Sequence, residues 1–191
     1  DGHSTGGSLG MGLGAARRAA DHFSLTSSPR GTCVVVEKYR RKNPSVMDFA
    51  ALTSPRSGMT ANGDQHEAYG FDGESMLVAL VDGHGSGEPA ERSSKLALQV
   101  IGRYATLPLD LMIESVHQAL AAEPDMRGSE LILARFVPPV LSLAGVGNLG
   151  AVLRADQEYT YRPQMGCCGL VLPGRIRVKS FEIMKRFDLF L

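Results

Sequence analysis

The 191-residue sequence contains no tryptophan, only three cysteines, and no apolar run long enough to form a membrane-spanning helix. Two of the cysteines, Cys167 and Cys168, are adjacent, and the three provide neither a disulfide framework nor the ligand spacing of a zinc site. These absences argue against a disulfide-stapled secreted scaffold and against a protein that crosses a membrane. A reducing, cytoplasmic setting is therefore the expected location.

An excess of charge of either sign is also missing. The chain carries 20 Lys and Arg residues and 20 Asp and Glu residues, so its formal net charge at pH 7 is zero. No basic field favours nucleic acid or an anionic membrane surface, and neither is expected as a partner. The hydrophobic fraction of 43% is ordinary for a globular chain, and the length predicts one domain or slightly more.

Composition divides the chain into a short first piece, residues 1–42, a linker, 43–45, and a longer second piece, 46–191. In the first piece a glycine-rich opening precedes an expected helix over 13–23 and an expected strand over 33–39. A segment of about forty residues is too short to bury a core of its own. We therefore expect this piece to pack on the rest or to be the tail of another domain.

The second piece shows strands, then two helices, then more strands, which differs from the regular alternation of a βαβ fold. The helices are expected over 88–104 and 109–121. The expected strands cover 47–52, 68–71, 76–81, 131–136, 140–144, 151–155, 175–181 and 187–191. This order predicts an α+β sandwich in which helices pack on largely antiparallel sheets.

Two carboxylates stand where strands begin or end. Asp82 closes an apolar strand and is followed by three glycines within five residues, and Asp64 follows Asn62 and Gly63. If the two carboxylates face each other, they form an oxygen-rich site that suits Mg²⁺ or Mn²⁺ better than Zn²⁺. Each also has a simpler interpretation, because Asp before Gly is a common turn former and Asn-Gly-Asp suits a hairpin turn.

Several motifs of the second piece resemble one family. Residues 82–87, DGHGSG, resemble the D-G-x-G-x-G signature of SpoIIE-like protein phosphatases, the bacterial branch of the metal-dependent type 2C class. Residues 63–64 match the first Gly-Asp of that family, 143–148 resemble its A-G-x-G-N turn, and 166–169 resemble its later glycine-rich loop. Within the family, the resemblance is closest to the RsbX-like members.

The resemblance implies an α/β/β/α sandwich and the hydrolysis of phosphoserine or phosphothreonine with two Mn²⁺ or Mg²⁺ ions. It implies that Asp82 bridges the ions, that Gly83 offers its carbonyl, and that Asp64 holds the neighbouring ion. His84 and Asn148 are candidates for contact with phosphate or substrate. His84 has the alternative of an exposed loop residue that the fold tolerates.

The resemblance also names a partner class, a phosphorylated STAS-domain protein or another stressosome component. The family carries a further Ser-Asp-Gly after the strand that 187–191 resembles, and the sequence ends before it. We therefore expect a chain truncated at both ends, with a third metal-binding carboxylate outside the 191 residues. A rival hypothesis is a signalling module that binds a phosphorylated protein without cleaving it.

The glycine-rich opening resembles a second family. Residues 1–18, with Asp21-His22-Phe23 and Gly31-Thr32, resemble the end of an RsbT-like ATPase domain, the anti-sigma-factor serine kinase branch of the GHKL class. The implied ATP contacts are Thr5, Gly6, Gly7, Leu9, Gly10, Gly12 and Gly14. The family's Mg²⁺-holding Asn motif has no counterpart here, so ATP binding is expected only in a longer parent chain. An ATP-dependent kinase is the third hypothesis, and a flexible N-terminal stretch is the alternative to it.

Two further features have two interpretations each. The Cys167–Cys168 pair could serve redox or metal chemistry, and we favour two small buried hydrophobic residues. Arg127, in a turn between a helix and a strand, could steer a phosphopeptide, and we favour a solvated charge.

Overall fold

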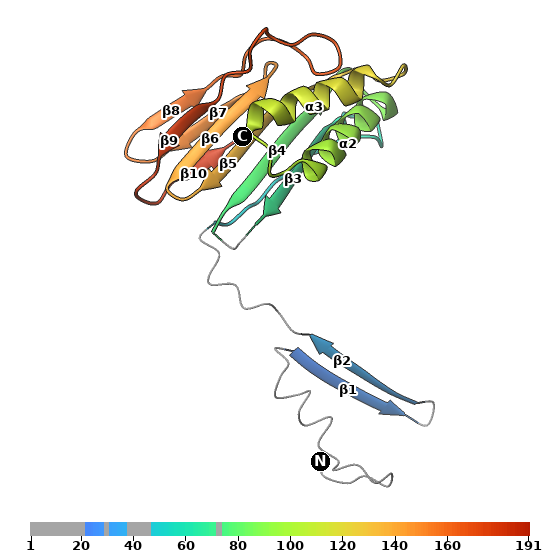
Figure 1. Cartoon of the computed structure of the whole chain (residues 1–191). Coiled ribbons are helices and arrows are strands. Elements are labelled where there is room, and N and C mark those ends of the chain that lie inside the picture. Colours follow the sequence, from blue (N-terminus) through green and yellow to red (C-terminus); the bar gives the residue numbers. More distant parts are fainter. Residues whose placement is uncertain (1–21, 29–30, 38–46, 72–73) are drawn as a thin grey trace. The chain divides into compact units, whose positions relative to one another are not determined.

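The computed structural model describes residues 22–28, 31–37, 47–71 and 74–191, and its contacts divide the chain into two compact units, 1–44 and 45–191. In the first unit, β1 (His22–Ser28) and β2 (Gly31–Glu37) form an antiparallel hairpin (Figure 1).

The helix expected over 13–23 falls largely outside the described residues. Its last two residues, His22 and Phe23, belong to β1, so the expected end of the helix is wrong. The reason is pairing, because Phe23 lies opposite Val36 in the β-branched run of β2. The assignment of 1–42 to an ATPase tail remains a prediction.

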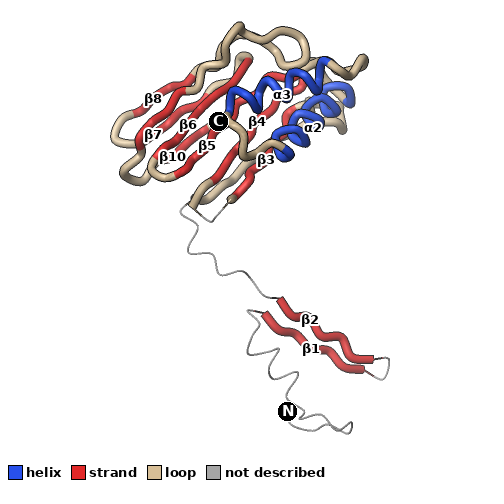
Figure 2. The backbone as a smooth tube through the Cα atoms, in the orientation of Figure 1, coloured by secondary structure: helices blue, strands red, loops and turns tan. Residues whose placement is uncertain are grey.

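The described residues of the second unit form two antiparallel sheets and two helices (Figure 2). The larger sheet has the order β3-β4-β5-β6-β9 and the smaller has the order β10-β7-β8. The strands are β3 (Asp64–Gly70), β4 (Met76–Gly83), β5 (Ser129–Val137), β6 (Val140–Val146), β7 (Ala151–Arg154), β8 (Glu158–Tyr161), β9 (Lys179–Glu182) and β10 (Asp188–Phe190). The helices are α2 (Glu88–Arg103) and α3 (Leu109–Ala121), and neither is long and apolar enough to cross a membrane.

The five-stranded sheet has a separate core on each face. Leu77, Ala79 and Val81 of β4 are fully buried in a cluster with residues of α2 and α3, which lie together on one face (Figure 1). On the other face Ile132 and Phe136 of β5 pack in a cluster with residues of β7 and β8. Alternate side chains of each strand thus contribute to the core on one face or to the core on the other. The predicted α+β class with antiparallel sheets is confirmed. Among the described residues both helices cover one sheet, so they supply one of the two helical layers expected.

The structure differs from the expected strands in three places. Residues 47–52 are irregular and have no partner strand, and Leu52 is 95% exposed, so strand propensity without pairing was insufficient there. The Glu158–Tyr161 strand was missed, because three of its four side chains are exposed and only pairing with β7 defines it. The strand expected over 175–181 is confined to Lys179–Glu182, the part that pairs with β6.

Candidate functional site

Three carboxylates lie side by side at one end of the five-stranded sheet. Asp64 of β3 is the pairing partner of Asp82 in β4, and Asp82 is the pairing partner of Glu130 in β5. Directly paired residues of antiparallel strands project from the same face. On β4 that face carries Val78, which packs in the core shared with the smaller sheet, so the three side chains project on the inter-sheet side. We call Asp64, Asp82 and Glu130 the carboxylate row.

The electrostatics of the row centre on Asp82. Its pKa is raised from 3.8 to about 6, first by partial burial and then by the negative charges of Asp64 and Glu130. A hydrogen bond between the side chains of Asp64 and Asp82 adds to the rise, and nearby His84 offsets part of it. Such crowding is relieved by a proton or by a bound cation, since either one reduces the repulsion between like charges.

The turn before β3 fixes Asp64. The side-chain oxygen Oδ1 of Asn62 accepts a hydrogen bond from the Asp64 N–H at 3.0 Å. The Gly63 carbonyl accepts the Gly83 N–H at 3.1 Å and also the hydroxyl of Ser94 from α2. The chain bends at Gly63 and enters β3 at Asp64, whereas the β3–β4 hairpin closes at the other end of the strands, so the hairpin turn of the simpler interpretation is wrong. The bend holds the first carboxylate beside the second.

Gly83 cannot be replaced without moving α2. A Cβ added there would overlap the carbonyl oxygen of Ala90. The end of β4 therefore lies closer to α2 than any residue with a side chain would allow. Beyond it, Gly85 and Gly87 have φ values of +99° and +74°, and the exposed His84 donates its N–H to the Gly128 carbonyl at 3.0 Å. Residues 83–87 therefore form an open loop next to Asp82, and α2 follows from Glu88.

Arg127 lies against this loop. A Cβ added to Gly85 would be 3.5 Å from Nη1 of Arg127, and the Arg127 N–H donates to the Ser93 hydroxyl at 3.2 Å. The exposed guanidinium is thus beside the loop that follows Asp82. The sequence interpretation of a solvated charge is compatible with this exposure, and the side chain lies at Gly85, three residues after Asp82.

Glu130 was missed by the sequence reasoning. Its Oε2 accepts the Asn148 N–H at 2.9 Å, and a Cβ on Gly147, whose φ is +117°, would overlap the Glu130 side chain. The available signal was an acidic residue directly before the apolar run 131–134. Asn148 contacts the row through its backbone, so its predicted substrate contact remains a prediction.

The donor set fits a hard divalent cation. Within the described part of the chain, no group of three or more His, Cys, Asp and Glu residues is arranged to hold a metal ion by itself. Mg²⁺, however, usually keeps several waters and is held by one or two carboxylates. The neighbouring carboxylates of Asp64 and Asp82 provide oxygen atoms of this kind, and the Gly83 carbonyl remains a predicted ligand.

Two other sets of predicted residues remain, the ATP contacts and the cysteine pair. Thr5, Gly6, Gly7, Leu9, Gly10, Gly12 and Gly14 lie outside the described residues. Cys167 and Cys168 are buried, and burial raises the pKa of both thiols, that of Cys168 to about 12. Both therefore stay protonated and act as buried apolar residues.

No protein-family model and no curated sequence matches this chain. Solved structures do. One chain, from a structural description of the bacterial stressosome, has 22% identity and a TM-score of 0.67 over 71% of this chain and 70% of its own length. RsbX in complex with magnesium has 21% identity and a TM-score of 0.64 over 71% of this chain and 68% of its own.

A chain with the phosphatase domain and a fragment of the regulatory domain of SpoIIE from Bacillus subtilis is also similar, with 16% identity and a TM-score of 0.59 over 70% of this chain and 42% of its own. The fold is that of the type 2C protein phosphatases. This confirms the resemblance to SpoIIE-like and RsbX-like proteins at the level of the fold. The compact unit 45–191 contains the carboxylate row, and the assignment of 46–191 to a phosphatase domain remains a prediction.

Proposed function

We propose that this protein is a metal-dependent protein serine/threonine phosphatase that acts on a phosphorylated STAS-domain regulator in a bacterial sigma-factor or stressosome pathway. The observation that carries the proposal is the pairing of Asp64 with Asp82 at the end of a type 2C sheet. The raised pKa of Asp82 supports it, because the apo protein holds together negative charges that a divalent cation would neutralise.

Each residue of the site has a role in this proposal. Asp64 and Asp82, with the Gly83 carbonyl, would hold the metal, and a bound divalent metal supplies an activated water and neutralises phosphate oxygens. Glu130 raises the negative potential beside Asp82. The exposed guanidinium of Arg127 lies beside the loop after Asp82, where it can attract and orient the phosphate of a substrate.

The test is release of phosphate from a phosphorylated STAS-domain protein in the presence and absence of Mn²⁺. Asp82→Asn removes one negative charge and one metal-binding oxygen at nearly constant volume. Asp125→Asn, at an exposed position between α3 and β5, is the matched control. We expect Mn²⁺-dependent release by the wild type and the control, and none by Asp82→Asn. Equal release by all three proteins would refute the assignment of Asp82.

A second candidate is a module that binds a phosphorylated protein without hydrolysing it. It is favoured by the lack, among the described residues, of a self-sufficient group of three metal ligands. If the wild type binds the phosphorylated STAS-domain protein and releases no phosphate, this candidate replaces the first. The third hypothesis, an ATP-dependent anti-sigma-factor serine kinase, depends on residues outside the described part of the chain and remains a sequence prediction.

A further inference from the structure

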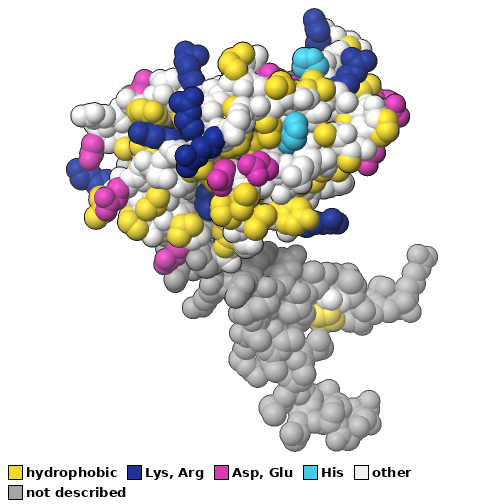
Figure 3. All heavy atoms as spheres, turned by 45° about the horizontal axis from the view of Figure 1, so that its top comes forward, with side chains coloured by type: hydrophobic (Ala, Val, Ile, Leu, Met, Phe, Trp, Pro, Cys, Tyr) yellow, Lys and Arg dark blue, Asp and Glu magenta, His cyan; other side chains and the backbone are white. Residues whose placement is uncertain are grey.

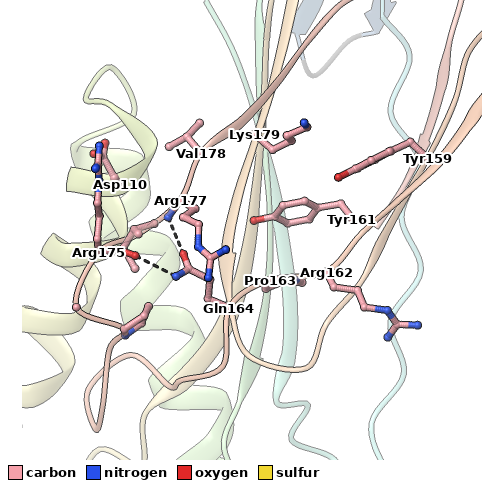
Figure 4. Close-up of a pocket in the computed structure, with 13 residues that line it drawn as sticks. Asp110, Tyr159, Tyr161, Arg162, Pro163, Gln164, Arg175, Arg177, Val178 and Lys179 are labelled. Carbon is pink, nitrogen blue, oxygen red and sulfur yellow. Dashed lines mark hydrogen bonds between the residues drawn. The ribbon is translucent and has the colours of Figure 1, made fainter.

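A groove of about 1040 Å³ lies outside the carboxylate row. Its walls come from the start of α3, from β8, from the segment that follows β8, and from the residues that lead into β9 (Figure 4). Pockets for small ligands have volumes of about 300–1000 Å³, so this groove is larger than a single phosphate ion requires.

The groove is lined by cations. Arg162, Arg175, Arg177 and Lys179 line it, against one carboxylate, Asp110. All four cationic side chains are exposed, and none forms an ion pair with a described residue. Lys and Arg side chains also gather over part of the molecular face shown in Figure 3. In a chain of zero net charge, this local excess favours an anionic ligand.

Three of the cations follow one another along the segment that leads into β9. Arg175 lies in a bend, Arg177 follows in irregular chain, and Lys179 begins β9. A row of cations along one segment suits a ligand with several acidic groups better than a ligand with a single charge. Among the described residues β9 is an edge strand, paired only with β6, and such an edge can accept an added strand.

One glutamine holds the backbone at two of the cationic residues. The side chain of Gln164 donates from Nε2 to the Arg175 carbonyl at 3.0 Å and accepts the Arg177 N–H through Oε1 at 2.6 Å (Figure 4). The Gln164 carbonyl accepts the Gly147 N–H at 2.8 Å, and the Gly147 Cα faces Glu130 of the carboxylate row. The groove and the row are thus joined through a short stretch of ordered backbone.

We propose that this groove binds an extended acidic segment of the protein whose phosphorylated residue enters the carboxylate row. The proposal rests on the proposed function for the identity of that protein, and on the groove alone for its acidic character. The length of the cationic line favours a polypeptide over a free anion. The overall charge balance favours a polypeptide over a nucleic acid, which requires a broad basic surface.

The test uses the full chain and a fluorescein-labelled oligoglutamate peptide, with binding measured by fluorescence anisotropy at low ionic strength. Arg175→Glu with Arg177→Glu reverses two groove charges. Arg103→Glu with Arg186→Glu makes the same charge change at exposed positions outside the groove. We expect the groove variant to bind about tenfold more weakly than the wild type and the control variant to bind nearly as well.

A second variant, Arg175→Gln with Arg177→Gln, controls for misfolding of the charge-reversal variant, because it removes the two positive charges without adding negative ones. It should give an intermediate loss, and far-ultraviolet circular dichroism should match the wild type. Equal weakening in the groove and control variants would overturn the proposal, since it would show a non-local charge effect. Equal or tighter binding of a single-stranded oligonucleotide through the same residues would also overturn it.

Hydrolysis of p-nitrophenyl phosphate separates this proposal from the proposed function, because the small substrate needs no groove. If the wild type hydrolyses it and the groove variant retains that activity, the active site is intact in both proteins. The oligoglutamate affinities then test the role of the groove by themselves. If the wild type does not hydrolyse it, the proposed function fails, and the oligoglutamate result still decides whether the groove binds acidic chains.

Discussion

Replacing Asp82 by Asn should stabilise the metal-free protein at neutral pH while removing a ligand of the proposed metal site. The pKa of Asp82 rises from 3.8 to about 6, which corresponds to about 3 kcal/mol of repulsion and lost solvation when the group is ionised. The side chain remains partly exposed, and solvent screening reduces this to about 1–2 kcal/mol. We expect the free energy of unfolding of Asp82→Asn to exceed that of the wild type by this amount at pH 7.5.

The pH dependence follows from the direction of the shift. The folded carboxyl has the higher pKa, so between about pH 4 and pH 6 the folded state binds more protons than the unfolded state. The free energy of unfolding of the wild type should therefore fall as the pH rises through this window. The Asn variant lacks that contribution, so the two proteins should converge below about pH 4.

The assay is urea unfolding followed by far-ultraviolet circular dichroism, because the chain has no tryptophan. It is run at pH 4, 6 and 7.5 without metal on the wild type, Asp82→Asn and Asp125→Asn, and at pH 7.5 with Mn²⁺. Mn²⁺ should stabilise the wild type and the Asp125→Asn control, and leave Asp82→Asn unchanged. The reasoning is refuted if Asp82→Asn is no more stable than the wild type at pH 7.5, or if Mn²⁺ stabilises it equally.

Three further outcomes are expected. Gly83→Ala should lower the free energy of unfolding by about 3 kcal/mol, because its Cβ would overlap the Ala90 carbonyl, whereas Gly70→Ala, with open space around it, should cost far less in the same urea titration. Glu130→Gln keeps an acceptor for the Asn148 N–H and removes a charge, so calorimetry should show several-fold weaker Mn²⁺ binding; unchanged affinity would contradict the role of Glu130. Arg127→Ala should raise KM for a phosphopeptide about tenfold with a smaller effect on kcat, and an unchanged KM would exclude contact with the phosphate.

Local sequence signals predicted the elements that carry their own pattern. Helices α2 and α3 and strand β4 lie within a residue or two of their expected bounds. The helices carry an amphipathic pattern over their full length, and β4 is a continuous apolar run that ends at Asp82. The predictions for 47–52 and for β8 were wrong because neither segment carries a clear pattern of its own. Their strand character depends on whether a partner lies beside them, and no local pattern records that.

The candidate site likewise contains residues that local sequence predicted and residues that only the fold brings together. The sequence identified Asp64, Asp82 and Gly83, because a carboxylate at a strand end next to glycine is a local signal. Glu130 is 48 positions beyond Asp82 in the chain and joins it only through the β4–β5 register. Arg127 likewise meets the Gly85 loop only after the helices have folded back along the sheet.

The sequence by itself determined the α+β class, the oxygen-rich character of the site and its main carboxylates, since composition, strand alternation and glycine placement are properties of neighbouring residues. Only the tertiary structure decided that three carboxylates form one row, that Asp82 gains a raised pKa, and that cations from separate segments line one groove. These features depend on strand register and on distances between residues far apart in the chain, because electrostatic repulsion and burial act through space.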